Sequence, residues 1–412
     1  MNDSQQQPAA APLLSGLKVL DVGTWIAGPA AATVMADFGA EVIKLESLEG
    51  DPLRQLAQGP TSPPCDHNYF WVLDGRNKRS LALDLKDPAA APVRDALLRW
   101  ADVLVTNFRP DLAERLALDW ARVKTLNPKL IYAHITGYGD AGPEAGKPGY
   151  DTTAWWSRSG LADWVRLPGA RPAMSAPGMG DHATAMALYG AIMTALWARD
   201  RTGEGRRVTT SLLANGFWSN GMMASMTLCG APLPERDPAR PVANALAAQY
   251  ETKDQRWLQL TLLNEAREWP KLLGALGAEA LQADPRFADG DARRADPEGL
   301  YQALATYFHR LTLEEAKAVL AEAGIPAAIL TAVTELAEDP QALAADILTP
   351  VAEPQPGWTH TVNSPIAIEG AEKVAPRYAP ALGEHSAAIL EELGFDAATV
   401  AGLQAQGVLG GA

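Results

Sequence analysis

Short apolar runs alternate with helix-like segments through the first 136 residues of the chain. Residues 17–23 (LKVLDVG) and 40–46 (AEVIKLE) are each long enough for one buried strand, and Gly28-Pro29 between them opens a helix of small residues. Further strands are expected at 79–85, 101–107 and 129–136. Strands that alternate with helices in this way predict a mostly parallel sheet with helices on both faces.

The alternation stops near residue 213, and the rest of the chain has its own patterns. We expect a Rossmann-like large α/β domain over 1–212, to which 352–412 return, and a smaller α+β domain over 233–330. The segments 213–232 and 331–351 are then linkers. The N-terminal residues MNDSQQQPAAAP have neither a basic start nor an apolar core, so they predict a disordered tail and no signal peptide.

Composition narrows the classes of function. The chain of 412 residues has a formal charge of −14, which disfavours nucleic acid and anionic membranes as partners. Its two cysteines, Cys65 and Cys229, form no CxxC pair, so a reducing cytoplasm is the expected compartment. Only six histidines are present, and no metal site is expected. The apolar run Ala183–Ala198 is too short to span a bilayer and predicts a buried helix.

Two glycine patterns imitate dinucleotide sites. Gly137–Gly142 fits GxGxxG after a strand, but the prolines and glycines that follow prevent a helix from opening there. The turn after the first strand has Gly23 and Gly28 at the wrong spacing, and Trp25 obstructs a phosphate cradle. An NAD dehydrogenase stays as one alternative function.

Asp181 follows Pro-Gly-Met-Gly at the start of the apolar helix expected from His182. An aspartate at this position is expected to be a helix N-cap. The backbone N–H groups and the helix dipole would also favour the carboxylate, which would keep Asp181 ionised as a nucleophile. Gly178 and Gly180 would leave space for a substrate.

Six sequence blocks occur in order along the chain: AGPAAATVMADFGAEVIKLE, NKRSLALDLK, ADVLVTNFRP, LNPKLIYAHITGYGDAGP, PGYD and GMGDHATA. Through these blocks the chain resembles the class III CoA-transferases, a superfamily that includes formyl-CoA transferase, carnitine CoA-transferase and the α-methylacyl-CoA racemases. The likeness covers about residues 14–212 and resumes at GIPAAIL and LGEHSAAILEELG. The resemblance implies an acyl-CoA:carboxylate CoA-transferase whose nucleophile is Asp181. It implies an aspartyl–acyl anhydride followed by an aspartyl-CoA thioester, with the CoA thioester as substrate and no further cofactor.

The resemblance also implies contacts to CoA and substrate, residue by residue. The matching positions are Ala27, Leu83, Lys86, Asn107, Phe108, Arg115, Tyr150 and Leu212. Formyl-CoA transferase has basic residues where this chain has Ser47 and Pro148. Other cations would then hold the CoA phosphates, and the candidates are Lys147, Arg54 and the cluster Arg76, Lys78 and Arg79.

The acyl substrate is expected to differ from formate or oxalate, because Ile26 replaces a glutamine of formyl-CoA transferase and TLLNEAREWP replaces its glycine-rich loop. A bulky, aromatic or dicarboxylic acid is the expected class. Trp25, Trp155 and Trp156 either line such a pocket or belong to the core.

Two alternatives remain within the resemblance. An α-methylacyl-CoA racemase would have His-Asp where this chain has Tyr150-Asp151, and tyrosine is a weak base with a pKa near ~10. A non-catalytic CoA-binding protein is the second. The resemblance further implies a homodimer of interlocked rings.

Overall fold

The computed structural model describes residues 11–60, 62–233 and 236–411 of the chain. Residues 1–10, which contain most of the expected tail, lie outside the described residues. The chain forms two compact units: the larger comprises 1–165, 173–231 and 341–412, and the smaller comprises 166–172 and 232–340. Each unit is described by itself below.

A seven-stranded sheet organises the larger unit. Its order is β12-β3-β2-β1-β4-β5-β6, and every pair is parallel except β12 with β3. The fold is therefore mixed α/β with a mostly parallel sheet, as the alternation predicts. The strands are β1 (Lys18–Asp21), β2 (Glu41–Glu46), β3 (Arg79–Leu83), β4 (Val103–Thr106), β5 (Ile131–Thr136), β6 (Arg207–Ser211) and β12 (Leu409–Gly410).

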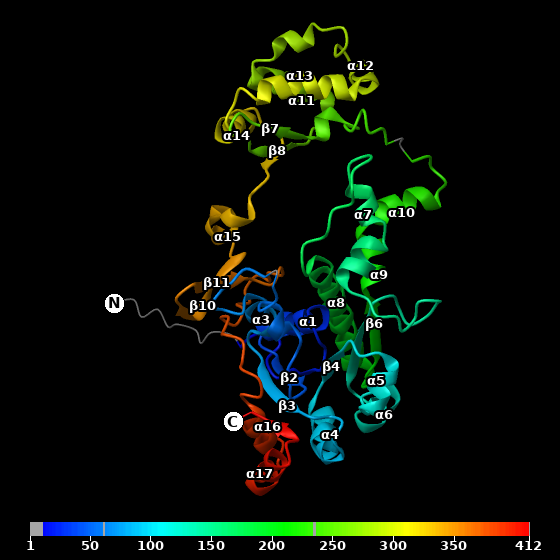
Figure 1. Cartoon of the computed structure of the whole chain (residues 1–412), viewed down its shortest axis with the longest axis vertical. Helices are drawn as coiled ribbons and strands as arrows, with labels where there is room; N and C mark the ends of the chain where they lie inside the picture. Colours follow the sequence, from blue (N-terminus) through cyan, green and yellow to red (C-terminus); the bar gives the residue numbers. More distant parts are fainter. Residues whose placement is uncertain (1–10, 61, 234–235, 412) are drawn as a thin grey trace. The chain divides into compact units, whose positions relative to one another are not determined.

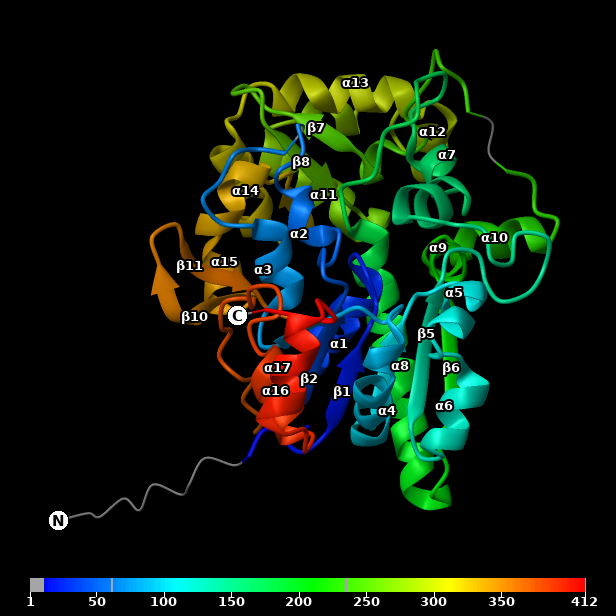
Figure 2. The same ribbon diagram turned by 60° about the horizontal axis from the view of Figure 1, so that its bottom comes forward.

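Helices cover both faces of this sheet, because the strand residues point alternately into two separate apolar cores. One core contains α1 (Ala27–Asp37), α3 (Tyr69–Gly75) and α8 (Met179–Thr202). The other contains α4 (Ala91–Trp100), α6 (Trp120–Leu126), α16 (Ser386–Glu392) and α17 (Ala397–Ala405). In Figures 1 and 2 the C-terminal helices α16 and α17, coloured red, lie beside the blue strands of the N-terminal half of the sheet. The C-terminal segment therefore completes this unit.

The remaining elements of the larger unit are short. Its additional helices and its small two-stranded sheet are α2 (Leu53–Leu56), η1 (Pro88–Ala90), α5 (Pro110–Arg115), η2 (Asp151–Ser157, a π-helix), α7 (Leu161–Val165), α9 (Leu212–Ser219), α10 (Gly221–Leu228), β10 (Leu348–Gln355) and β11 (Trp358–Val362). Helices α9 and α10 thus occupy most of the segment that the sequence suggests as the first linker.

The smaller unit has an antiparallel sheet of order β7-β8-β9 with its own apolar core. Its elements are η3 (Ala245–Ala247), β7 (Gln249–Glu251), β8 (Trp257–Leu260), α11 (Glu265–Leu276), η4 (Glu279–Gln282), α12 (Gly290–Ala295), α13 (Pro297–Phe308), α14 (Leu313–Glu322) and β9 (Ala327–Ile329). The chain then continues through η5 (Val333–Glu338) and α15 (Pro340–Ala344).

The strand order creates a switch point beside β1. From β1 the chain proceeds to β2 and β3 on one side and to β4, β5 and β6 on the other. In open parallel sheets, ligand clefts form at the carboxyl ends of the strands where the direction of winding changes. The loops that follow β1, β4 and β5 are therefore the place to look for a site.

Candidate active site

A cleft of about 950 Å³ lies at this position in the larger unit. It is lined by the turn after β1, the loop after β4, the segment between β5 and η2, and the start of α8. We call it the Asp181 cleft. The sequence-predicted site residues that line it are Ala27, Asn107, Phe108, Tyr150, Asp181 and Leu212. The fold thus brings these residues together from widely separated parts of the chain.

Asp181 lies in the first turn of α8 and not at its N-cap. The helix begins at Met179, and its N-cap is Gly178, whose backbone is left-handed with φ of 75°. The expectation of an N-cap aspartate was therefore wrong by three positions, because the left-handed Gly178 starts the helix earlier than the apolar pattern indicates. Asp181 points into the cleft from the third helical residue.

The electrostatic surroundings of Asp181 also differ from the expectation. Burial raises the pKa of Asp181 to about 7, with a further increase from the Asp151 carboxylate and a smaller one from Asp74, while His182 acts in the opposite direction. The sequence analysis expected the helix start to keep Asp181 ionised, whereas desolvation and two neighbouring carboxylates act in the opposite direction and raise its pKa. A carboxyl group whose pKa is shifted this far by burial and neighbouring charges marks a candidate functional site.

Asp151 is the carboxylate that most affects Asp181. Its side chain is only 6% exposed, at the first residue of η2. One oxygen, Oδ1, accepts a hydrogen bond of 2.7 Å from the Thr152 backbone N–H. Among the described residues, Oδ2 has no hydrogen-bond partner. A buried, half-satisfied carboxylate beside another carboxyl group is a costly arrangement that marks functional sites.

His182 and Asp74 form a pair next to Asp181. Nε2 of His182 lies 3.1 Å from Oδ1 of Asp74, which is 5% exposed at the C-terminal half of α3. Burial alone would lower the pKa of His182, but the hydrogen bond and charge of Asp74, together with the charge of Asp181, raise it. The sequence analysis missed this pair, although His182 is part of the GMGDHATA block.

The turn after β1 forms one wall of the cleft and has an unusual backbone. Trp25 has a φ of 65°, a left-handed conformation that costs a side-chain-bearing residue about 1 kcal/mol or more. Its backbone N–H donates to Oδ1 of Asp51 at 3.0 Å, and Oδ2 of Asp51 is paired with the buried Lys44 at 2.9 Å. The indole ring meets the ring of Tyr150 edge-on, with centroids 6.0 Å apart. A buried ion pair therefore holds an aromatic wall in place.

Asn107 is committed to the same turn. Its Oδ1 accepts from the Thr24 backbone N–H at 2.9 Å, and its Nδ2 donates to the Thr24 carbonyl at 2.8 Å. The side chain therefore ties the loop after β4 to the turn after β1, in addition to lining the cleft.

Trp155 and Trp156 are core residues. They are buried, stack on each other with centroids 6.1 Å apart, and form an apolar cluster with Ala154 and Leu212. Of the three tryptophans considered from the sequence, only Trp25 lines the cleft.

Three predicted CoA contacts lie outside the cleft. Leu83 is fully buried in β3, Lys86 is exposed just beyond that strand, and Arg115 is 69% exposed at the end of α5. Leu83 and Lys86 occupy the same carboxyl edge of the sheet, two strands away from β1. Their contact with CoA stays a prediction.

The basic residues suggested for the phosphates separate into two groups. Four of them form ion pairs with acidic residues: Arg54 with Glu46, Arg76 with Asp37, Lys78 with Asp21, and Arg79 with both Glu41 and Glu392. Lys147 instead lines the cleft, where it also pairs with Glu144 at 2.8 Å. Arg109 lines it as well and was missed by the sequence analysis, although it belongs to the block ADVLVTNFRP. Lys147 and Arg109 are thus the cations that the fold offers at the cleft.

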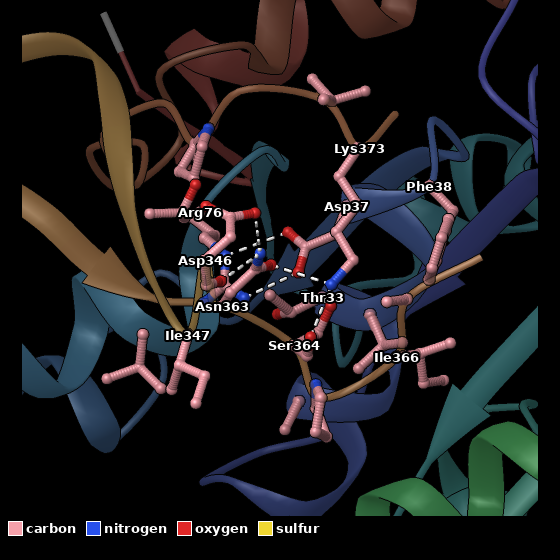
Figure 3. A pocket seen from close by; sticks show the side chains of 18 of the residues that line it. Thr33, Asp37, Phe38, Arg76, Asp346, Ile347, Asn363, Ser364, Ile366 and Lys373 are labelled. Atoms are coloured by element: carbon pink, nitrogen blue, oxygen red, sulfur yellow. Dashed lines mark hydrogen bonds and ion pairs between the residues drawn. The ribbon is translucent and has the colours of Figure 1, made fainter. Parts of the chain in front are cut away.

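A second, larger cleft of about 1230 Å³ lies in the same unit and is here named the Asp37 cleft. Figure 3 shows its polar floor, where Arg76 donates to Asp37 at 2.7 Å and Asn363 donates to Asp346 at 3.0 Å, with apolar side chains around them. His182 and Asp74 also line it. The first turn of α8 thus faces both clefts.

Within the described ranges, no cluster of three or more side chains suited to a metal ion occurs. Likewise, none of the described helices is long and apolar enough to cross a membrane.

The comparisons with known proteins identify the family of this chain. The family model described as CoA-transferase family III matches residues 14–386. The chain is 33% identical over 389 residues to (R)-2-hydroxy-4-methylpentanoate CoA-transferase of Clostridioides difficile, covering 93% of this chain and 96% of that protein. It is 32% identical over 393 residues to cinnamoyl-CoA:phenyllactate CoA-transferase of Clostridium sporogenes, covering 93% and 94%.

A solved structure gives the same result. The crystal structure of a CAIB/BAIF family protein from Brucella suis superposes with a TM-score of 0.82 at 29% identity, covering 93% of this chain and 100% of that one. The chain therefore belongs to CoA-transferase family III. Its class of enzyme is that of the class III CoA-transferases.

Proposed function

We propose that this protein transfers coenzyme A from an acyl-CoA thioester to a free carboxylic acid, with the Asp181 carboxylate as the nucleophile. The observation that carries the proposal is the position of Asp181 in a ligand-sized cleft at the switch point, with a pKa of about 7. Nucleophilic catalysis needs a carboxylate that is available near neutral pH and accessible to a thioester. We propose CoA as a substrate, with no resident cofactor.

The proposed reaction proceeds through covalent steps. An oxygen of Asp181 attacks the thioester carbonyl carbon, the C–S bond breaks, and CoA leaves as a thiolate. The thiolate then attacks the aspartyl carbonyl of the anhydride and releases the donor acid, which leaves an aspartyl-CoA thioester. The acceptor carboxylate attacks that thioester and releases the thiolate again. Attack of the thiolate on the acceptor's acyl carbon forms the new CoA ester and regenerates the Asp181 carboxylate.

A bulky or aromatic acid is the proposed acceptor class. The wall beside Asp181 consists of Trp25 and Tyr150 in edge-to-face contact, with Ile26 next to them in the cleft. Such rings favour branched or aromatic acyl groups over formyl or oxalyl groups. The two curated relatives described above are named for a branched 2-hydroxy acid and for an aromatic 2-hydroxy acid.

Trapping the covalent intermediate tests the proposal. Enzyme mixed with donor acyl-CoA alone should accumulate an adduct, and hydroxylamine should convert it to a hydroxamate on the peptide that contains Gly180-Asp181. Asp181→Asn should fold and bind CoA but form no adduct, and its rate should fall at least about 10³-fold. Asp151→Asn is the matched control, since it should still form the adduct. Adduct on another residue would refute the assignment of Asp181.

The same experiment separates the racemase alternative. A racemase exchanges the α-proton of a 2-methylacyl-CoA, so incubation in D₂O would label the substrate without a covalent adduct. The residue before Asp151 is the exposed Tyr150, at the position where the resemblance gives a racemase its histidine. We therefore expect no exchange. If neither adduct nor exchange occurs with any CoA ester, a non-catalytic CoA-binding protein becomes the better interpretation.

We also propose a homodimer, with the two chains interlocked. Support comes from helices α9 and α10, where Trp218, Met222 and Leu228 are 84% to 87% exposed, and from Trp197 on α8, which is also exposed. Large apolar side chains exposed together indicate a surface that another protein covers. Sedimentation equilibrium should give twice the mass of the chain down to nanomolar concentration, and a stable folded monomer would contradict the proposal.

The two cysteines are both free and exposed, which supports a reducing cytoplasm as the proposed compartment.

A further inference from the structure

Two carboxyl groups, those of Asp151 and Asp74, act on the proposed nucleophile Asp181 in the direction that favours its neutral form. A neutral carboxyl group cannot attack a thioester, so this arrangement opposes the proposed chemistry. The neighbouring group that acts in the opposite direction is His182, the next residue in the chain.

The imidazole of His182 is held by Asp74. Nε2 lies 3.1 Å from Oδ1 of the buried Asp74. A β-carbon on Gly178, the helix N-cap, would lie 3.4 Å from both Cε1 and Nδ1, so that edge of the ring faces the position of the missing side chain at the start of α8. The ring therefore lies between Asp74 of α3 and the first turn of α8, one residue from Asp181.

We propose that His182, held as an imidazolium by Asp74, is a positioning residue that keeps Asp181 ionised for attack on the acyl-CoA. This inference rests on the proposed role of Asp181 as the nucleophile. The Asp74 carboxylate accepts the hydrogen bond from Nε2–H, which favours the charged ring, and the charged ring in turn favours the charged form of Asp181.

The position of His182 excludes the more familiar role of a proton donor to the leaving thiolate. Asp181 lines the Asp181 cleft, whereas His182 lines the Asp37 cleft and is 45% exposed there. The CoA thiolate forms on the side of Asp181, so the ring acts through the electrostatic field across the first helical turn. Partial exposure screens this field, and a moderate effect is therefore expected.

Several charged groups act on the ionisation of Asp181 and of His182. Asp181 is faced by His182 on its own helix, by Asp151 from η2 and by Asp74 from α3. His182 is faced by Asp74, Asp181 and Arg76, and Arg76 disfavours the imidazolium. Arg76 is itself paired with Asp37 through two contacts of 2.7 and 3.0 Å, which reduces its effect on the ring.

The same charge assists the last step of the proposed reaction. When the thiolate attacks the acceptor's acyl carbon of the anhydride, the bond from that carbon to the Asp181 oxygen breaks and the Asp181 carboxylate leaves. Negative charge develops on Asp181 in this transition state, one residue from the imidazolium. A cation fixed in advance at this place stabilises the leaving carboxylate without rearrangement.

The test compares the pH dependence of adduct formation, measured in single turnovers of the full-length protein with a donor acyl-CoA. The acid limb is the part of the profile where the rate of adduct formation falls as the pH is lowered. His182→Gln keeps a hydrogen-bonding group but not the charge, so its acid limb should move to higher pH by about half a unit or more. His182→Lys restores a cation and should return the limb toward that of the wild type. His309→Gln is the matched control: this histidine is also about half exposed (52%) and lies 3.9 Å from Glu251, but it is in the smaller unit.

A double-mutant cycle with Asp74 distinguishes charge from structure. Asp74→Asn removes one repelling carboxylate as well as the support for the imidazolium, so its limb should move less than that of His182→Gln. The acid limb of the double variant should lie at lower pH than that of His182→Gln. In His182→Gln the Asp74 carboxylate still repels the charge on Asp181, and the double variant lacks that carboxylate. A purely structural role predicts slower adduct formation at every pH with no displacement of the limb.

The outcomes separate this inference from the proposed function. If wild-type enzyme forms no adduct at Asp181, the proposed function fails. If it does, and the limb of folded His182→Gln coincides with that of the wild type and of His309→Gln, the role assigned to His182 is overturned. Circular dichroism and thermal unfolding identify any variant that has lost its fold, and if His182→Gln has done so, the uncharged variant His182→Asn replaces it in the comparison.

Discussion

The indole ring of Trp155 lies against the backbone of Gly180, the residue that precedes the proposed nucleophile. A β-carbon on Gly180 would come within 2.5 Å of Cγ of the indole. The buried tryptophan thus sets the position of the first turn of α8 relative to η2. Only glycine at position 180 lets the helix backbone lie this close to the ring. Trp155 contributes to the site by positioning Asp181, although it does not line the cleft.

Gly180→Ala should therefore damage activity more than stability. The added methyl group must displace either the buried ring or the helix, at a cost of roughly 1–3 kcal/mol in the free energy of unfolding. A displacement of about 1 Å at Asp181 is expected to reduce kcat/KM about 10²-fold. Gly190→Ala in the same helix is the control, because within the part of the chain that the structure describes no atom outside the local helix backbone lies within 4 Å of its added β-carbon. It should stabilise the protein by up to about 1 kcal/mol with unchanged kinetics. Equal behaviour of the two variants would contradict the contact.

The sequence was sufficient for the strands and for their order along the chain. The strands at 17–23, 40–46 and 129–136 are short, apolar and separated by clear breaks, so local pattern alone placed β1, β2 and β5 within a few residues. The helix α1 could be predicted from the sequence in the same way, because its run of small side chains is a local pattern.

What the sequence could not supply are relationships between distant residues. The pKa of Asp181 depends on Asp151 and Asp74, which lie 30 and 107 positions earlier in the chain and meet it only after folding. Whether Trp155 belonged to the core could not be decided from an aromatic run, since the deciding contact is with Gly180 on another helix. The pairing of Arg54 and Lys78 with buried acids was hidden for the same reason.

The pH dependence of the reaction follows from the pKa of Asp181. In the proposed mechanism the ionised form of Asp181 attacks, so kcat/KM for the donor should rise about tenfold per pH unit below about 7 and level off above it. Asp151→Asn removes a carboxylate that raises the pKa of Asp181, so its acid limb should move to lower pH. Initial rates between pH 5 and 9 measure both. A profile without an acid limb would show that another group, or another step, controls the rate.

Trp25 offers a way to change acyl selectivity without loss of the fold. Trp25→Gly retains the backbone N–H that donates to Asp51 and removes a side chain from a left-handed position with φ of 65°. The stability should change by less than about 1 kcal/mol, because relief of backbone strain offsets the lost contact with Tyr150.

The acceptor profile of Trp25→Gly should change more strongly. kcat/KM for bulky or aromatic acids should fall by about tenfold relative to small acids, while CoA binding is retained. Gln255→Gly is the control, since Gln255 has a φ of 61° and lies in the smaller unit. An unchanged ranking of acids would remove Trp25 from the acyl pocket.

The predicted CoA contacts can be tested against the cations of the cleft. The resemblance assigns Lys86 and Arg115 to CoA, whereas Arg109 and Lys147 are the basic residues that line the Asp181 cleft. We expect Lys86→Ala with Arg115→Ala to weaken CoA binding roughly tenfold or more, because charge-assisted contacts to phosphate are lost. Lys317→Ala with Arg286→Ala, in the smaller unit, should leave it unchanged. If calorimetry instead shows that CoA binding is weakened by Arg109→Ala with Lys147→Ala, the CoA phosphates lie over the Asp181 cleft.

The Asp181 carboxyl group should make the protein less stable at neutral pH than a neutral side chain would. The pKa of Asp181 is raised from 3.8 to about 7 in the folded state, so folding favours the protonated form. That contribution is fully present below about pH 4 and is lost as the pH rises through about 7. Asp181→Asn cannot ionise and escapes this loss.

The free energy of unfolding of Asp181→Asn should therefore match the wild type near pH 4 and exceed it by on the order of 2 kcal/mol at pH 8, after allowance for solvent screening. Urea unfolding at one fixed protein concentration measures the difference, because the concentration also sets the stability of a dimer. Asp66→Asn, at an exposed aspartate, is the control and should follow the wild type at both pH values. An Asp181→Asn variant that is no more stable than the wild type at pH 8 would mean that the Asp181 carboxylate is already well compensated. In that case Asp181 would be ionised at lower pH, and the acid limb assigned to it would have to arise from another group.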